Sequence, residues 1–242
     1  MLLAAAIVAP AARAADACYV EPAQLLESPH RLERTARLVA AGELVRIVAL
    51  GSSSTEGVGA SDYGHAYPAQ TQAALAGLLP RSHVIVFNKG IGGQEAREMV
   101  DRLAADVLAE KPDLVIWQVG TNSLIRSKDL QTLVDDIFAG VRRIQAAGVD
   151  VMLMGPQKSP RVDGKQERTM FAQHLQVIAE TARIPYFARY EIMAGWIARR
   201  QMTMDQMIDP DGLHMTDLSY RCLGAAVAQM IVNLTRAPLA RQ

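Results

Sequence analysis

Residues 48–60 read VALGSSSTEGVGA, an apolar run that ends at Gly51 and is followed by three serines, a threonine and a glutamate. Glycine and serine are ordinary residues of a turn between a strand and a helix, so a turn alone explains the stretch. A nucleophilic serine explains it equally well. The choice between these interpretations depends on whether the rest of the chain supplies the other groups that such a serine needs.

The apolar run belongs to a repeating pattern of strands and helices. Short runs rich in Val, Ile and Leu predict buried strands at 44–50, 83–88, 113–119, 149–155 and 184–188. Helical patterns occupy 28–41, 68–79, 94–109, 128–147, 166–182 and 216–234. Because these strands are too apolar to have a solvated face, helices must cover both sides of a parallel sheet. We therefore predict an α/β fold, a three-layer α/β/α sandwich with a five-stranded parallel sheet.

Composition limits the class of partner. The 242 residues are 50% hydrophobic, which is ample for a buried core. Lys plus Arg equals Asp plus Glu at 25 each, so no overall field attracts nucleic acid or an anionic membrane. We expect a small or uncharged partner, and the sequence does not indicate the oligomeric state. No repeat or linker divides the chain, which predicts a single domain over 15–242.

The N-terminal segment resembles a secretory signal peptide over residues 1–14. An apolar run at 2–12 is followed by the small residues Ala12 and Ala14, which fit a cleavage site before Ala15. No Lys or Arg precedes the run, so an ordinary alanine-rich helix is the alternative. The run is shorter than the roughly 20 apolar residues that cross a bilayer. We expect a secreted or periplasmic protein with no stable membrane insertion.

The chain has two cysteines, Cys18 and Cys222. In an exported protein, two cysteines favour a disulfide, which here ties the N-terminal segment to the last helix. The alternative is a buried free thiol, because Cys222 lies on the apolar face of that helix.

The segment 190–209 interrupts the rhythm of strands and helices and is rich in methionine. Its methionines are Met193, Met202, Met204 and Met207. Methionines at this density fill irregular gaps in a core, or they form an adaptable wall beside a pocket.

Chemically useful residues follow the predicted strands. In an open parallel sheet, ligands bind at the carboxyl ends of the strands. The segments there read GSSSTEG, NKGIGGQE, GTNS and GPQKSP, and DPDGLH lies near the end of the chain. Together they contain a hydroxyl, an imidazole, a carboxylate and amide donors, which are the four groups that a serine hydrolase needs.

The order of these segments resembles the SGNH hydrolases, also called the GDSL esterase and lipase family. The first block of that family has the form G-D-S followed by Thr and Gly. Here GSSSTEG matches it with Ser53, Thr55 and Gly57, and Ser52 stands in place of the aspartate. The substitution keeps the nucleophile but removes whatever support the aspartate gives to the loop.

Three later blocks extend the resemblance over most of the chain. The N-x-G-x-x-G block is matched by Asn88, Gly90 and Gly93, and the G-x-N-D block by Gly120 and Asn122, with Ser123 replacing the acid. The final D-x-x-H block is matched by Asp211 and His214. The resemblance implies a flavodoxin-like SGNH hydrolase fold.

The resemblance also implies roles for particular residues. Ser53, Asp211 and His214 form the expected catalytic triad, with Asp209 as the competing acid. The expected oxyanion hole consists of the backbone N–H groups of Ser53 and Gly93 and the side-chain amide of Asn122. Gly93 suits this role because it has no Cβ to obstruct a substrate.

The remaining histidines do not indicate a metal. His30, His65, His83 and His174 have no partners at the spacing of metal ligands, and the two cysteines are far apart, so we expect no zinc site. GSSSTEG lacks the lysine of a phosphate-binding loop. We expect no cofactor.

The expected function is that of an exported serine esterase. It hydrolyses carboxylic esters through an acyl-enzyme on Ser53, and an envelope location makes O-acetylated glycans attractive substrates. An acyltransferase that uses the same triad is an alternative. A flavodoxin-like binding module without catalysis is the alternative from another class.

Overall fold

The computed structural model describes residues 18–21, 24, 28–126 and 129–236, so the expected signal peptide lies outside the described residues. The strands are parallel and form one sheet in the order β2-β1-β3-β4-β5. They are β1 (Val45–Gly51), β2 (Val84–Gly90), β3 (Leu114–Gln118), β4 (Asp150–Met154) and β5 (Tyr186–Phe187). The predicted five-stranded parallel sheet is confirmed.

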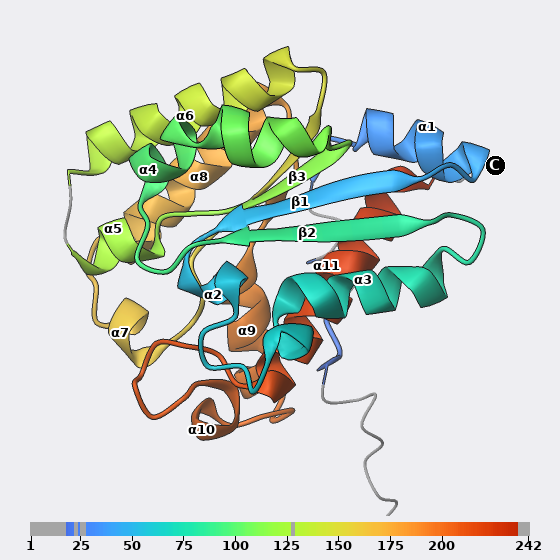
Figure 1. Ribbon diagram of the computed structural model, residues 1–242. Coiled ribbons are helices and arrows are strands. Elements are labelled where there is room, and N and C mark those ends of the chain that lie inside the picture. The colour runs from blue at the N-terminus through green and yellow to red at the C-terminus, as the bar shows by residue number, and fades with distance from the viewer. Residues whose placement is uncertain (1–17, 22–23, 25–27, 127–128, 237–242) are drawn as a thin grey trace, which may run out of the picture.

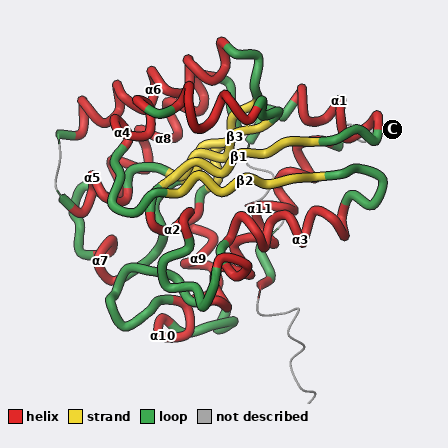
Figure 2. Tube along the Cα trace, viewed as in Figure 1, coloured by secondary structure: helices red, strands yellow, loops and turns green. Residues whose placement is uncertain are grey.

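Helices cover both faces of this sheet, as Figure 1 and Figure 2 show. The α-helices are α1 (Glu33–Ala41), α2 (Ser53–Glu56), α3 (Tyr67–Leu78), α4 (Ala96–Asp101), α5 (Thr121–Ile125), α6 (Leu130–Ala146), α7 (Pro160–Asp163), α8 (Arg168–Ala182), α9 (Arg189–Ala198), α10 (Met204–Met207) and α11 (Asp217–Thr235). Helices α3 and α11 pack together on one face, and α4, α6 and α8 on the other. The architecture is the predicted three-layer sandwich. Within the described ranges, every helix is too short or too polar to span a bilayer.

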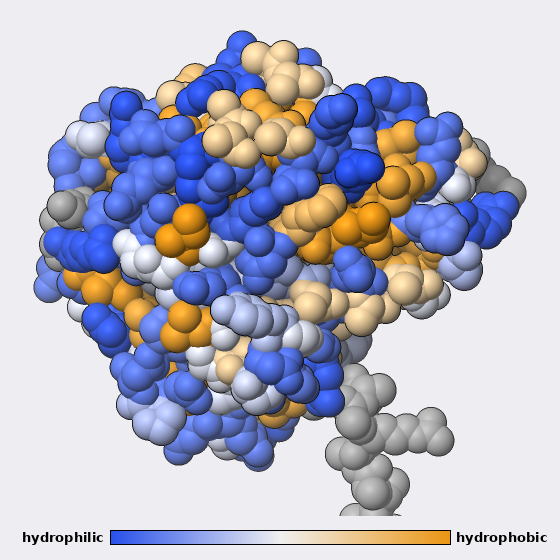
Figure 3. Space-filling model, viewed as in Figure 1, coloured by the Kyte–Doolittle hydropathy of each residue, from blue (hydrophilic) through white to orange (hydrophobic). Residues whose placement is uncertain are grey.

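Two cores, one on each face, hold the layers together. All five residues of β3 are buried, because helices cover this central strand from both sides. Each fully buried Val, Leu or Ile side chain contributes about 1.5–3 kcal/mol of transfer free energy. The edge strand β2 is less covered, and Ile85 is 40% exposed on it. Figure 3 shows hydrophobic residues at the surface on the side of the molecule that is seen in Figure 1.

Two helices differ from the predicted ranges for local reasons. The pattern at 28–41 becomes helical only at Glu33, after Leu32, whose φ of −96° and ψ of 78° are not helical. The pattern at 94–109 is interrupted after Asp101 and continues as a π-helical turn, η4 (Leu103–Val107), and a 3-10 turn, η5 (Leu108–Glu110). At the interruption, the Arg102 guanidinium donates hydrogen bonds to backbone carbonyls at the ends of β1 and β2.

The methionine-rich segment fills the core. Met193, Met202 and Met207 are buried, and Met204 packs against the same core cluster. The segment folds as α9, a turn and α10. The gap-filling interpretation is therefore correct for these side chains.

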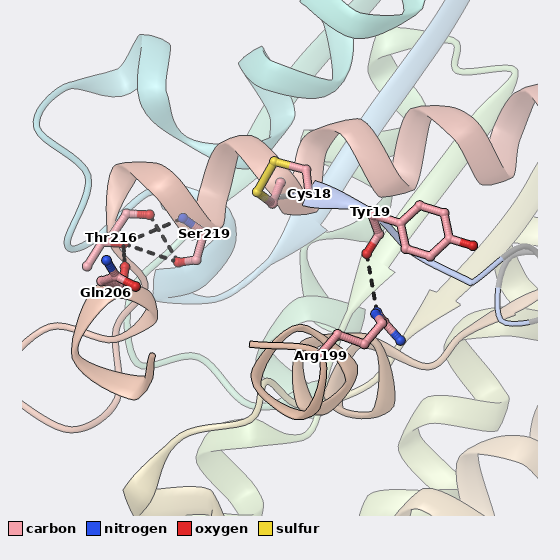
Figure 4. The surroundings of a disulfide bond; sticks show 7 residues. Cys18, Tyr19, Arg199, Gln206, Thr216 and Ser219 are labelled. Carbon is pink, nitrogen blue, oxygen red and sulfur yellow. Dashed lines mark hydrogen bonds between the residues drawn. A yellow bond between two sulfur atoms is a disulfide. The ribbon is translucent and has the colours of Figure 1, made fainter. Parts of the chain in front are cut away.

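The two cysteines form the expected disulfide. Cys18 and Cys222 are bonded across 204 residues, with a Cα–Cα distance of 4.7 Å. The bond fixes the N-terminal segment to α11, whose Cys222 is buried (Figure 4). The guanidinium of Arg199 also donates a hydrogen bond to the Tyr19 carbonyl at 3.2 Å. Both the bridge and the buried position expected of Cys222 are present.

Candidate active site

Ser53 lies at the carboxyl edge of the sheet. It follows β1, which lies between β2 and β3, and it is the first residue of α2. The chain order reverses at this point, since β2 lies on one side of β1 and β3 on the other. Crevices at such reversals are the usual ligand sites of parallel sheets. The turn leaves Ser53 partly exposed while Ser52 and Ser54 are buried.

The loop after α10 brings an imidazole and a carboxylate to Ser53. His214 Nε2 lies 3.0 Å from Ser53 Oγ, and His214 Nδ1 is hydrogen-bonded to Asp211 Oδ2. The other oxygen of Asp211 accepts the backbone N–H groups of Leu213 at 2.8 Å and His214 at 2.9 Å. Asp209 instead donates its backbone N–H to the His214 carbonyl. Asp211 is therefore the acid on the imidazole.

The contacts of Asp211 favour its ionised form. Partial burial raises the pKa of the carboxyl, but the hydrogen bonds from His214 and Leu213 outweigh it and hold the pKa below its ordinary value. Because the carboxylate stays ionised at neutral pH, it continues to accept the Nδ1–H bond. The tautomer that leaves Nε2 free to accept a proton from Ser53 is thereby favoured.

Gly93 and Asn122 lie in the two neighbouring loops. Gly93, after β2, has a φ of +79°, which is the left-handed region that favours glycine. Asn122 in α5 donates one amide hydrogen from Nδ2 to the Gln94 carbonyl at 2.8 Å. An amide nitrogen carries two hydrogens, so a second donor remains on Asn122. The hydrogen bond ties the loop of Asn122 to the loop of Gly93.

The carboxyl end of β2 also packs closely on α2. A Cβ placed on Gly90 would lie 2.0 Å from the backbone nitrogen of Glu56, so only glycine allows this approach. Asn88 uses its side chain to fix the contact. It donates to the Glu56 carbonyl at 3.2 Å and accepts from the Gly90 N–H at 2.9 Å. Asn88 and Gly90 thus act in the packing of the end of β2 against α2.

Gln118 supports the turn that carries Ser53, and it does so at Ser52, the position where the resemblance leads one to expect an aspartate. Its side-chain oxygen accepts the backbone N–H of Ser52 at 3.0 Å, the Ser52 hydroxyl at 3.2 Å and the Thr55 hydroxyl at 3.1 Å. The residue is fully buried at the end of β3. A lone glutamine in the apolar run 113–119 was the available sequence signal, and the sequence interpretation did not use it.

A buried arginine lies behind the same turn. Arg189 is 0% exposed, and it donates to the Ser54 hydroxyl at 3.1 Å, the Gly155 carbonyl at 2.9 Å and the Gln157 side-chain oxygen at 2.8 Å. All three acceptors are uncharged. Burial lowers the pKa of the guanidinium to about 10, so it remains protonated at neutral pH. An arginine immediately after a short strand carries no distinctive sequence pattern, and sequence analysis missed it.

Gln157 connects this arginine to the histidine loop. Besides Arg189, its oxygen accepts the Thr121 hydroxyl at 3.0 Å, and its nitrogen donates to the Leu213 carbonyl at 3.2 Å. One buried network therefore joins the loops after β1, β3 and β4 to the loop that carries Asp211 and His214. Gln157 lies in the segment GPQKSP, which the sequence analysis noted without assigning a role.

The other histidines are not brought to this site by any described contact. His30 pairs with Glu180 at 3.0 Å, and His65 contacts Asp62 and Ser61. No group of three or more His, Cys, Asp or Glu side chains is arranged to hold a metal ion among the described residues.

Comparison with known proteins identifies the family. A family model described as the non-GDSL lipase-like family matches residues 17–237. The chain belongs to this family. The description agrees with the first block, in which Ser52 replaces the aspartate, and the match places the chain among the SGNH hydrolases.

Relatives of this non-GDSL lipase-like protein include two carbohydrate esterases and an acylhydrolase. It is 36% identical over 81 residues to an acetylxylan esterase of Geobacillus stearothermophilus. The matched region covers 33% of this chain and 37% of the relative. A two-domain esterase active on acetylated mannans superposes with a TM-score of 0.73 at 19% identity, over 89% of this chain and 56% of that one. A lipase/acylhydrolase from Enterococcus faecalis superposes with a TM-score of 0.65 at 22% identity, over 78% of this chain and 96% of that one.

Proposed function

We propose that the protein is an exported serine esterase that hydrolyses carboxylic esters through an acyl-enzyme on Ser53. The observation that carries the proposal is the continuous hydrogen-bonded line from Ser53 Oγ through the His214 imidazole to Asp211. A serine, a histidine and an acid in this arrangement are the parts of a catalytic triad on any fold.

In the proposed reaction, Ser53 Oγ attacks the ester carbonyl and His214 Nε2 accepts the hydroxyl proton. The same imidazole then gives that proton to the departing alcohol, which leaves an acyl group on Ser53. Water attacks the acyl-enzyme with His214 again as base, and the acid and free Ser53 are released. Asp211 orients the imidazole and stabilises its protonated form.

The oxyanion formed in each step is proposed to be bound by the backbone N–H groups of Ser53 and Gly93 and by the free amide hydrogen of Asn122. The Gln94 carbonyl fixes the orientation of the Asn122 amide. Because donors held in place before the reaction need no reorientation as the charge develops, they stabilise the transition state more than the substrate.

Replacement of Asn122 with alanine is expected to lower kcat about 10²-fold, because one donor to the transition-state charge is lost. Steady-state hydrolysis of p-nitrophenyl acetate measures the effect. Full turnover combined with a raised KM would instead make Asn122 a residue that positions the substrate.

Acetylated glycans are the substrates that we propose. Two of the relatives are described as acting on acetylated xylan or mannan, and the balanced charge of the chain suits an uncharged substrate. A series of p-nitrophenyl esters from acetate to palmitate tests the preference for a short acyl group. Highest kcat/KM on the long-chain esters would exclude an acetylesterase.

Two alternatives are separated by further assays. An acyltransferase would pass the acetyl group to a sugar hydroxyl, so acetylated sugar would accumulate when an unacetylated acceptor is added. A binding module without catalysis would not react with a fluorophosphonate probe. The distance of 3.0 Å between His214 Nε2 and Ser53 Oγ favours an active enzyme over the binding module.

Export is proposed on the N-terminal pattern and on the disulfide. Disulfides persist in oxidising compartments and are rare in the cytosol. Protein purified from the native host is expected to begin at Ala15, so that residues 15–242 form the mature single domain. N-terminal sequencing measures this, and a mature chain that still begins at Met1 would contradict cleavage.

A further inference from the structure

A cavity lies beside α2, the helix that begins at Ser53, at the exposed edge of the sheet. Its volume is about 350 Å³, within the range of small-molecule sites. Glu56, Tyr63 and Gln72 contribute polar groups to it, and Pro68 and Val86 are among its apolar lining residues. The lining comes from α2, η3 (Tyr63–His65), α3 and β2, and Figure 1 shows α2 and α3 below the edge strand β2.

Glu56 connects this cavity to Ser53. The two residues are three apart on α2, and residues at this spacing lie on one face with their Cβ atoms about 5–6 Å apart. Both side chains border Gly92. A Cβ placed on that residue would lie 2.9 Å from Glu56 Oε2 and 3.9 Å from Ser53 Cβ. A group attached to an ester at Ser53 therefore reaches Glu56 within the length of one sugar ring.

The polar groups of the cavity are available to a ligand. The Glu56 carboxylate makes no hydrogen bond or ion pair with any other described residue. Tyr63 is 79% exposed although it is aromatic. Gln72 uses its side-chain oxygen to accept the Val86 N–H at 2.7 Å, which fixes the amide and leaves its nitrogen as a donor. These groups supply an acceptor, an aromatic face and a donor.

This combination suits a neutral, hydroxyl-rich ligand. A carboxylate accepts hydrogen bonds from sugar hydroxyls, and charged acceptors give the stronger bonds. An aromatic ring and the apolar Pro68 and Val86 suit the C–H face of a sugar ring. The same carboxylate disfavours an anionic substrate by like-charge repulsion. A fatty acyl chain cannot form hydrogen bonds with these polar groups.

We propose that this cavity binds a neutral sugar residue of the ester substrate, with Glu56 accepting its hydroxyl hydrogens and Tyr63 packing on its ring. The proposal rests on the esterase function proposed above and adds to it the place where the glycan binds. Glu56 and Tyr63 then determine specificity for glycan esters over simple acetate esters.

The test compares kcat/KM for acetylated xylo-oligosaccharides with kcat/KM for p-nitrophenyl acetate, which has no sugar. Glu56→Gln keeps the shape of the side chain and removes its charge, and Tyr63→Ala removes an exposed ring. The ratio of the two kcat/KM values is expected to fall about tenfold in each variant, mainly through a higher KM for the oligosaccharide. Glu43→Gln is the matched control, because Glu43 is exposed before β1 at the opposite end of that strand.

The outcomes separate this proposal from the proposed function. A ratio that stays at the wild-type value in both variants overturns the sugar site and leaves the esterase intact. A wild-type enzyme that cleaves p-nitrophenyl acetate but no acetylated oligosaccharide also overturns the site. Failure of the wild-type protein on every ester refutes the proposed function itself. If Glu56→Gln raises kcat/KM for p-nitrophenyl octanoate relative to the acetate, the cavity holds acyl chains instead.

Discussion

Replacing Ser53 with alanine is expected to lower kcat for p-nitrophenyl acetate by a factor on the order of 10⁶, because the variant lacks the hydroxyl that His214 contacts and that is proposed to form the acyl-enzyme. The fold is expected to remain intact, since alanine removes only a hydroxyl from a partly exposed turn. Steady-state kinetics measure the activity and circular dichroism the fold. A folded Ser53→Ala protein that keeps most of its activity would refute the proposed nucleophile.

Ser52→Ala and Ser54→Ala are the matched controls and are expected to retain far more activity. Their hydroxyls bind Gln118 and Arg189, so they shape the turn and do not attack. His214→Ala is expected to be about as damaging as Ser53→Ala, and the double variant little worse, because the members of a triad act as one unit. Asp211→Asn is expected to be less damaging. If Ser52→Ala or Ser54→Ala were the inactive variant, the nucleophile would have to be reassigned.

Replacing Arg189 with methionine is expected to lower both stability and turnover. The change removes a donor from three buried acceptors, of which the Gln157 oxygen still accepts the Thr121 hydroxyl. Each of the other two, if left unsatisfied, costs about 1–3 kcal/mol, so the free energy of unfolding falls by about 2 kcal/mol or more. The turn beside Ser53 and the loop of His214 lose their common support, and small displacements of reacting groups cost about 10²-fold in rate. Urea unfolding and kcat measure the two effects.

Arg189→Lys separates charge from geometry. Lysine keeps the positive charge but not the planar fork that reaches Ser54, Gly155 and Gln157 together. We expect it to restore part of the stability and little of the turnover. An Arg189→Met protein with wild-type unfolding midpoint and kcat would show that the network does not position the site.

The sheet was predictable from sequence because its signals are local and strong. Apolar runs such as 113–119 identify the strands, and their alternation with helices implies a parallel order. The loops that contain Ser53, Gly93 and Asn122 were predictable for a similar reason, since each follows a strand in a sequence block of its own. Asp211 and His214 share one short loop, so recognising the block located both residues.

The supporting network was not predictable because its members meet only in three dimensions. Gln118, Gln157 and Arg189 lie on three different segments, and none of them stands in a recognisable pattern with Ser53. The interruption of the helix after Asp101 was not predictable for the same reason, because the carbonyl groups that accept hydrogen bonds from Arg102 lie on β1 and β2. Helical periodicity reports which face of a helix is apolar and does not report such tertiary contacts.

The disulfide also sets an order in time. Cys18 is the first residue that the structure describes, and its partner follows 204 residues later. The bond can therefore form only after the sheet, the turn that carries Ser53 and the loop that carries His214 have been synthesised. Once formed, the bond joins the two ends of a fold that already contains every loop of the candidate site.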